Sequence, residues 1–282
     1  MITIKNEHLE VVIDTLGAQM QSLKLDGKQY LWQGDKLYWG GKAPVLFPIV
    51  GGLRNNLTVI NGRIYSMKRH GFARFSEFSV VNQHENEVTL SICDNEETLK
   101  VYPFHFEFQV TFSVKDTTLT TEYTVINKDN CTLPFALGGH PAINCPINSD
   151  EAFEDYIVEF ECMENADCPT VSMETGLIDF NNRYPALKDS NVINLEHKLF
   201  YNDAMIFDNL NSKSCKLYSK KSGNGVKMDF ADYDMLGIWS AVNDAPFICL
   251  EPWIGCATTA DADDMFESNR GLIYLEEGSV CK

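Results

Sequence analysis

Hydrophobic and polar residues alternate along much of this chain, which is the pattern of β-strands that bury one face. The longest such run, residues 104–114, has an apolar side chain at nearly every second position. A polar turn at Lys115-Asp116 and a second run over residues 117–127, rich in Thr, Tyr and Val, follow it. We therefore expect these two segments to form an antiparallel hairpin.

Short turn sequences divide the rest of the chain into further strands. Asn61-Gly62 separates residues 57–60 from residues 63–65, and Asp26-Gly27 and Asn224-Gly225 indicate two more hairpins. The remaining strands are predicted at residues 9–13, 78–81, 88–93, 156–160, 215–218, 226–230, 236–240, 247–250 and 272–275.

Helical patterns are few. Residues 96–102, stopped by Pro103, predict one short helix, and residues 261–267 predict another whose acidic side chains face water. Residues 163–189 are rich in Asn and Asp and are interpreted as a long surface loop. Because no linker or low-complexity tract interrupts the chain, we expect a single domain over residues 1–282. The pattern predicts an all-β fold, a large antiparallel β-sandwich in which one concave sheet face could hold a ligand.

Composition narrows the functional classes. A hydrophobic content of 44% in 282 residues is ample for a substantial core. The net charge of −17 argues against nucleic acid or an anionic membrane as a partner, since both require clustered Lys and Arg. The N-terminus lacks the apolar segment of a signal peptide, and no apolar run approaches the ~18 residues of a membrane span. The nine cysteines show no Cys-x-x-Cys pair or zinc-type spacing, so we expect reduced thiols in a cytoplasmic protein and no metal.

His140, in the segment Leu137-Gly138-Gly139-His140-Pro141-Ala142, is the first candidate for chemistry. Its imidazole titrates near neutrality, and the flanking glycines and proline indicate a backbone that is neither ordinary strand nor helix. A general acid or base is one interpretation, and a turn histidine that caps a strand is the other.

Three more segments interrupt the strand pattern. Arg54 follows a glycine pair and could offer a fork of donors, or it could be a surface arginine on a loop. His70, beside Lys68 and Arg69, could be a neutral imidazole that donates or accepts a hydrogen bond, or it could end a hairpin that these cations keep soluble. Glu251, expected at the end of an apolar strand, could be a base with a raised pKa or a satisfied core carboxylate. The nearby Trp253 offers a flat apolar face of the kind that stacks on sugars.

Taken together, these motifs resemble the aldose 1-epimerase (galactose mutarotase-like) family, in particular its subgroup of bacterial proteins similar to those encoded in lactose operons. The resemblance covers nearly the whole chain and includes the order of five motifs: Gly51-Gly52-Leu53-Arg54, His70-Gly71-Phe72-Ala73-Arg74, Gly138-Gly139-His140-Pro141, Asn202-Asp203-Ala204 and Leu250-Glu251-Pro252-Trp253. It implies a β-sandwich of the type called a supersandwich, with a sugar in a cleft on one sheet face.

The resemblance also implies a cofactor-independent isomerase. Glu251 would be the base that removes the proton of the anomeric hydroxyl, and His140 the acid that protonates the ring oxygen. His70 would orient or polarise that oxygen, and Arg54, Asp203, Arg74 and Trp253 would bind the sugar.

The expected partner is a small sugar, a free aldohexose, and the chain is expected to be a monomer or a homodimer. Some family relatives act on hexose 6-phosphates, for which Arg69 and Arg74, with Lys42 and Lys68, would be the candidate phosphate contacts. A non-catalytic carbohydrate-binding protein is the third alternative.

Overall fold

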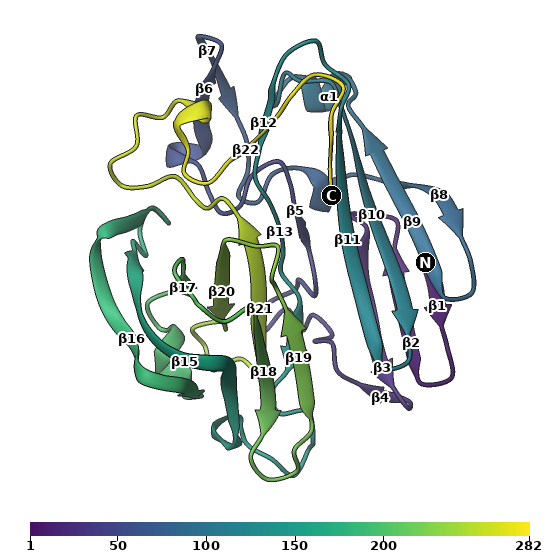
Figure 1. Cartoon of the computed structure of the whole chain (residues 1–282), viewed down its shortest axis with the longest axis vertical. Helices are drawn as coiled ribbons and strands as arrows, with labels where there is room; N and C mark the ends of the chain where they lie inside the picture. Colours follow the sequence, from purple (N-terminus) through teal and green to yellow (C-terminus); the bar gives the residue numbers. More distant parts are fainter.

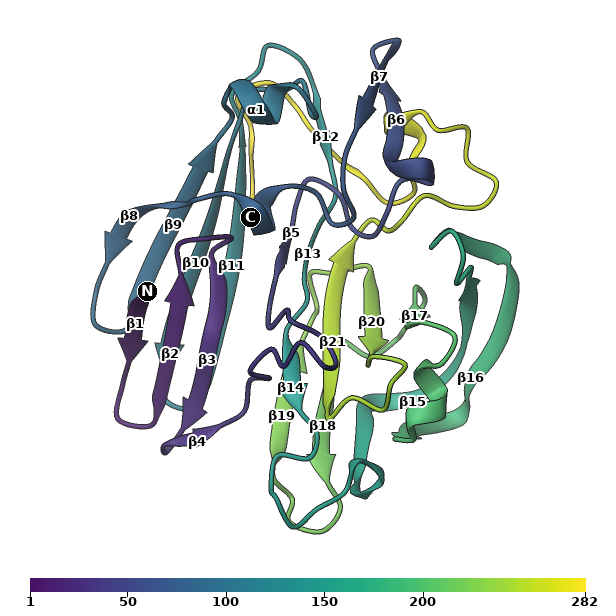
Figure 2. The same ribbon diagram turned by 180° about the vertical axis from the view of Figure 1, so that it is seen from behind.

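The computed structural model describes residues 1–282 and is built almost entirely from antiparallel β-strands (Figure 1). Strands hold 50% of the residues and helices only 7%, so the predicted all-β sandwich is confirmed. None of the helices has the length and hydropathy that a membrane crossing would need. Two pairs of packed sheets stand side by side, one on each side of the molecule in Figures 1 and 2.

The first pair holds the larger core. One sheet has the strand order β1 (Ile2–Lys5), β2 (Leu9–Asp14), β3 (Gln19–Leu25) and β4 (Lys28–Gln29). The other has the order β23 (Val280–Cys281), β11 (Thr118–Asn127), β10 (Phe106–Lys115), β9 (Glu87–Cys93) and β8 (Ser79–Gln83). Every second side chain of β10 is buried, as the alternating sequence predicts. These side chains belong to a core of 34 buried residues.

In the second pair, the larger sheet packs one face against its partner sheet and leaves the other face outside that core. Its six-stranded sheet has the order β17 (Met205–Phe207), β20 (Met235–Trp239), β21 (Phe247–Ile254), β13 (Leu137–Gly139) and β5 (Val45–Leu46), and β14 (Ala142–Asn144) also pairs with β21. The four-stranded partner sheet has the order β16 (Ile178–Asn194), β15 (Tyr156–Val171), β18 (Ser214–Ser219) and β19 (Gly225–Asp229). Leu236, Ile238, Ile248 and Leu250 join a core of 21 residues between these sheets. Because side chains alternate along a strand, the residues between them lie on the opposite face.

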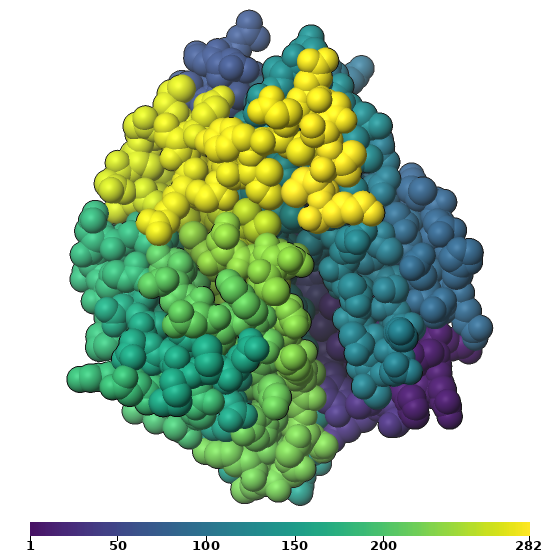
Figure 3. Space-filling model, viewed as in Figure 1, coloured from purple at the N-terminus to yellow at the C-terminus, as the bar shows by residue number.

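Shorter elements connect the two pairs of sheets. The hairpin of β6 (Leu57–Ile60) and β7 (Arg63–Ser66) projects at one end, and β12 (Leu133–Phe135) pairs with β22 (Ile273–Leu275) (Figure 1). The C-terminal residues, in yellow, cross from the second pair of sheets to the first (Figure 3), where β23 pairs with β11.

The predicted hairpins at residues 26–27, 61–62, 115–116 and 224–225 are confirmed by the pairing of the strands that flank them. The first predicted helix shortens to α1 (Glu96–Leu99), whose start is capped by the Asn95 side chain. The second prediction, at residues 261–267, is wrong. The Asp261 and Asp263 carboxylates there accept local hydrogen bonds from Thr259 and Met265, which compete with a helix. Only 3₁₀ turns remain, at Phe266–Ser268 and elsewhere at Arg54–Asn56, Ala73–Phe75, Phe153–Asp155 and His197–Phe200.

The interpretation of residues 163–189 as a loop is also wrong. They belong to the long hairpin of β15 and β16, whose pairing contains several register shifts. These irregularities break the two-residue alternation on which strand prediction depends. The hairpin tip between Val171 and Ile178 reaches the edge of the six-stranded sheet and contributes to the cavity described next.

Candidate active site

The face of the six-stranded sheet that points away from its core forms the floor of a cavity of about 520 Å³. This volume is within the range of small-molecule sites. The residues predicted to act in chemistry or binding that line it are His70, Arg74, His140, Asp203, Glu251 and Trp253. Arg54 is the predicted site residue that does not line it.

Strand register brings His140 and Glu251 together. Gly138 of β13 pairs with Trp253 of β21, and Ala142 of β14 pairs with Cys249. Counting inward from both pairs places His140 directly opposite Glu251, where cross-strand side chains are neighbours. The His140 Nε2 and Glu251 Oε2 atoms are 3.2 Å apart, and both side chains are buried.

The prediction that Glu251 lies at the end of an apolar strand is wrong, because Glu251 lies inside β21. A proline removes only one ladder hydrogen bond, and β21 continues past it to Ile254. Gly237 of β20 pairs with Glu251 on the other side, and a Cβ there would lie 2.7 Å from the Trp253 ring. The absence of a side chain at Gly237 therefore leaves the space that the Trp253 ring occupies.

The two glycines before His140 provide space for packing. A Cβ on Gly138 would lie 2.8 Å from the Pro252 carbonyl oxygen and 2.8 Å from Trp253 Cδ1. A Cβ on Gly139 would lie 3.0 Å from the Tyr123 hydroxyl oxygen. Both glycines belong to β13, so the expected unusual turn is an extended strand. Their small size fixes how closely β13 approaches its neighbours.

Aromatic rings surround His140. The Trp39 ring is stacked on the imidazole, with centroids 4.9 Å apart and an interplanar angle of 23°. The Trp239 ring meets it edge-on at 5.5 Å, and the His70 ring at 5.6 Å. The orientation of His140 is thus fixed on several sides by packing as well as by Glu251.

Burial controls the protonation of the pair. It raises the pKa of Glu251 well above the usual value, with a further increase from the Asp203 charge and an opposing effect of Trp253 and Arg69. Burial also lowers the pKa of His140 to about 3, and the Arg74 and Arg69 charges act in the same direction. Both shifts favour an uncharged pair, a neutral imidazole and a protonated carboxyl that share one proton. Movement of that proton along the 3.2 Å contact produces a carboxylate and an imidazolium without changing the net charge.

His70 is held by the loop of Gly51. The His70 backbone N–H donates to the Gly51 carbonyl oxygen (2.7 Å), and the Gly51 N–H donates to His70 Nδ1 (3.0 Å). His70 has a φ of 67°, a left-handed conformation that is uncommon for a residue with a side chain. Burial lowers its pKa well below the usual value, with smaller effects of His140, Arg69 and Arg74. The imidazole is therefore neutral, and because Nδ1 accepts, Nε2 carries the hydrogen.

Charged side chains stand around the cavity. Asp203 is half-buried with a left-handed φ of 78°, and its carboxylate accepts from the Ala204 N–H (2.8 Å). Arg74 packs over the Phe75 ring, 5.0 Å from its centroid. Neither Arg69 nor Arg74 has an acidic partner within ion-pair distance, although the chain as a whole is acidic. Two unpaired guanidinium groups at a cavity are available to a ligand.

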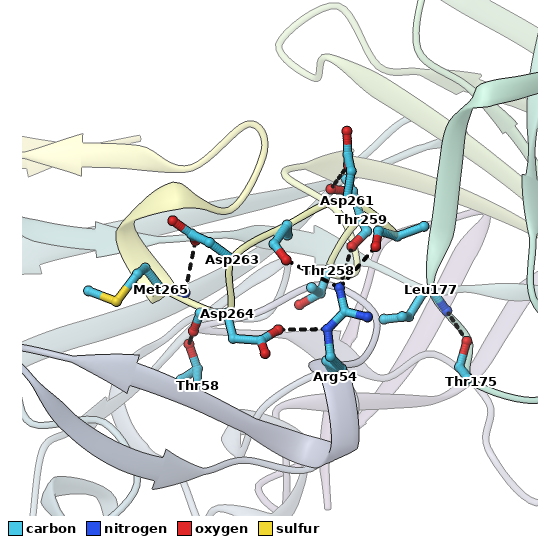
Figure 4. Close-up of polar contacts among 12 residues, drawn as sticks. Arg54, Thr58, Thr175, Leu177, Thr258, Thr259, Asp261, Asp263, Asp264 and Met265 are labelled. Carbon is cyan, nitrogen blue, oxygen red and sulfur yellow. Dashed lines mark hydrogen bonds and ion pairs between the residues drawn. The ribbon is translucent and has the colours of Figure 1, made fainter.

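Arg54 stabilises a different loop, so the prediction that it binds sugar is not supported by its position (Figure 4). Its Nε donates to Asp264 Oδ1 (2.7 Å), and its Nη2 contacts the carbonyl oxygens of Thr259 (3.2 Å), Ala260 (3.1 Å) and Ala262 (3.3 Å). These acceptors hold the guanidinium against residues 259–264. Arg69, by contrast, lines the cavity. Its Nη2 packs so closely on Gly176 that a Cβ at that glycine would overlap it.

Sequence analysis missed several cavity residues, chiefly Tyr38, Trp39, Trp239 and Asn243. One signal was available for the aromatic ones. The chain has only four tryptophans, and Trp39 precedes a Gly-Gly pair on a segment without strand alternation. Binding residues lie disproportionately on loops, which would have singled out Trp39. Trp239 ends an apolar strand and could not be told from a core residue.

Comparison with known proteins identifies the family of this chain. A family model described as aldose 1-epimerase matches residues 1–261. Protein LacX of Lactococcus lactis subsp. lactis, in its plasmid form, is 41% identical over 273 residues, which cover 94% of this chain and 91% of that protein.

Solved structures agree as well. A galactose mutarotase related enzyme from Lactobacillus acidophilus is 35% identical with a TM-score of 0.95, covering 99% of this chain and 94% of its own. A galactose mutarotase-like protein from Lactobacillus casei is 32% identical with a TM-score of 0.90, covering 100% and 97%. The family predicted from the motifs is therefore confirmed, and this chain belongs to the aldose 1-epimerase family.

Proposed function

We propose that this protein is a mutarotase that interconverts the α and β anomers of a free aldohexose without a cofactor. The observation that carries the proposal is the buried His140–Glu251 pair, whose proton-bearing atoms are 3.2 Å apart on the floor of a cavity that can hold a small molecule. Ring opening of a cyclic sugar needs one group to accept a proton and another to donate one, and this pair holds a single transferable proton.

The reaction follows from this arrangement. With the proton on His140, the Glu251 carboxylate removes the hydrogen of the anomeric hydroxyl while His140 Nε2 protonates the ring oxygen. The bond between the anomeric carbon and the ring oxygen breaks, and the anomeric carbon becomes an aldehyde. Rotation about the adjacent carbon–carbon bond presents the other face of the aldehyde, and the reverse proton transfers close the ring. The enzyme returns to its starting protonation state.

The surrounding residues supply binding and orientation. The His70 Nε2–H is the hydrogen-bond donor that would orient the ring oxygen, since its Nδ1 is occupied by the Gly51 N–H. Asp203 can accept from sugar hydroxyls, and Arg74 can donate to them. The flat face of Trp253, beside Glu251 on the floor, suits the C–H surface of a pyranose.

Polarimetry tests the assignment directly. In Glu251→Gln the base is lost while the shape is kept, so a fresh α-anomer should relax no faster than in buffer. His140→Asn should lose roughly 10²- to 10⁴-fold in rate while it still binds sugar. Glu107→Gln, on β10 in the other pair of sheets, is the matched control and should keep the rate. Full activity in Glu251→Gln would refute the assignment, and sugar binding without any acceleration by the wild type would indicate a binding protein.

A hexose-6-phosphate 1-epimerase is a second candidate, favoured by the unpaired Arg69 and Arg74 at the cavity. Lys42 and Lys68 do not line the cavity: the Lys42 ammonium contacts the Gln21 carbonyl oxygen (3.4 Å), and Lys68 lies over the Phe75 ring. On this alternative, glucose 6-phosphate binds more tightly than glucose, and the preference is lost in Arg69→Ala or Arg74→Ala. Equal binding of both sugars would favour the free aldohexose.

A further inference from the structure

Cys249 is a fully buried thiol beside the acid–base pair that the proposed reaction does not use. It precedes Glu251 by two residues on β21, so the two side chains are on the same face of the strand. Its Sγ, an imidazole nitrogen of His140 and a carboxylate oxygen of Glu251 all lie within 4.8 Å of one another. All three residues are buried.

We propose that His140, Cys249 and Glu251 form a binding site for a soft divalent cation of the Zn²⁺ type at the floor of the cavity. Thiolate, imidazole and carboxylate are the three ligand types that proteins use for zinc. The sequence did not predict this site, because His140 is brought in from the segment between β13 and β14. The single residue between Cys249 and Glu251 is not a zinc signature.

The separation of the His140 and Glu251 ligand atoms suits tetrahedral coordination. An imidazole nitrogen and a carboxylate oxygen that share one tetrahedral zinc ion are about 3.4 Å apart at ordinary bond lengths. The observed Nε2–Oε2 distance is 3.2 Å, so these two ligands are close to the required separation. Side-chain adjustment at Cys249 completes a three-ligand set, and the fourth position faces the cavity that His140 and Glu251 line.

Charge supports the same ligand set. A dication bound by a thiolate, a carboxylate and a neutral imidazole gives a site with no net charge, which burial requires. Binding displaces the thiol proton and the proton shared by His140 and Glu251, and both leave to solvent. The ligands are also held in place, because Trp39 stacks on His140, and Ala142 and Trp239 flank Cys249 on the two neighbouring strands.

Binding at this site would inhibit the proposed reaction, because the ion occupies both atoms that transfer protons. This consequence rests on the proposed function, whereas the site itself does not. Absorption spectroscopy with Co²⁺ tests the site independently of activity, since a cobalt–thiolate bond gives a charge-transfer band in the near ultraviolet.

The experiment titrates the full-length wild type, Cys249→Ser and Cys215→Ser with Co²⁺ under reducing, metal-free conditions. Cys215 is a buried cysteine in the second core and serves as the matched control. We expect a stoichiometric thiolate band in the wild type and in Cys215→Ser, displacement of that band by Zn²⁺, and no band in Cys249→Ser. Absence of the band from the wild type, or its persistence in Cys249→Ser, overturns the proposal.

A second measurement connects the site to the reaction. Zn²⁺ should slow anomer interconversion in polarimetry, and a chelator should restore the rate. The half-inhibiting Zn²⁺ concentration, measured relative to each variant's own metal-free rate, should rise by about tenfold or more in Cys249→Ser and not in Cys215→Ser. If the protein shows no mutarotase activity at all, the cobalt spectra still decide whether the site exists.

Discussion

At the scale of single residues, the position of the His140–Glu251 pair depends on the absence of side chains at the glycines of β13. A methyl group on Gly138 would meet the Pro252 carbonyl oxygen and Trp253 on β21, at 2.8 Å each. Gly138→Ala should therefore push β13 away from β21 and separate His140 from Glu251. Because a displacement of 1 Å can cost on the order of 10²-fold in rate, we expect a loss of that size by polarimetry.

Gly139→Ala provides the comparison for this prediction. Its new methyl group would meet the Tyr123 hydroxyl at 3.0 Å, the far end of a side chain that can move by a small amount. The loss of rate should therefore be smaller than in Gly138→Ala, and both proteins should remain folded by circular dichroism. Equal rates in the two variants would contradict the proposed role of Gly138.

The residue scale also shows where sequence reasoning stops. The motifs named His70, Arg74, His140, Asp203, Glu251 and Trp253, which all line one cavity. Arg54 was selected on the same grounds, but hydrogen-bond acceptors on residues 259–264 draw its guanidinium elsewhere. Which of several arginines reaches a cavity depends on tertiary contacts that no local pattern records.

At the scale of elements, β15 is joined to the segment before β18 through a buried carboxylate. Glu164 is 1% exposed and accepts from the Ser212 N–H (2.7 Å) and hydroxyl (2.6 Å) and from the Asn211 N–H (3.2 Å) and side-chain amide (3.1 Å). Glu164→Gln places an amide among donors, so we expect about 1–3 kcal/mol of lost stability in urea unfolding at neutral pH. Glu154→Gln, at an exposed position, is the matched control.

The stability that the Glu164 contact provides should also depend on pH. Burial alone would raise the pKa of Glu164, but the hydrogen bonds from Ser212 and Asn211 outweigh it and lower the pKa below the usual value. A carboxyl with a lower pKa in the folded state stabilises the fold above its unfolded pKa, and this contribution is lost as the pH falls through the folded pKa. The stability difference between wild type and Glu164→Gln should therefore shrink in acid. A difference that stays constant with pH would show that the charge of Glu164 is not what stabilises the contact.

Element prediction succeeded where alternation was regular and failed where it was not. The pairing of β10 with β11 was evident because ten consecutive pairs keep one register. The hairpin of β15 and β16 was missed because its register shifts repeatedly and its polar residues resemble a loop. Glu251 was expected at the end of an apolar strand, whereas β21 continues through Pro252 to Ile254.

At the scale of the whole molecule, the two pairs of sheets are interlocked through the ends of the chain. The core of the first pair contains Ile2 and also Leu275, and β23 pairs with β11 across the length of the sequence. The cavity likewise combines His70, from the segment after β7, with Glu251 of β21. We propose on these grounds that residues 1–282 form a single domain, because neither pair of sheets is complete without segments from both parts of the chain.

A single domain should unfold in one cooperative transition, and the tryptophans make this testable. Trp39, Trp239 and Trp253 line the cavity, and Trp32 packs beside Phe247 at 5.1 Å, so fluorescence reports the second pair of sheets. Far-ultraviolet circular dichroism reports the strands of both pairs. In urea the two signals should follow one curve, and saturating sugar should shift both midpoints upward together because ligand binding stabilises only the folded state. Separate transitions, with sugar shifting the fluorescence midpoint alone, would show instead that the two pairs of sheets are independent folding units.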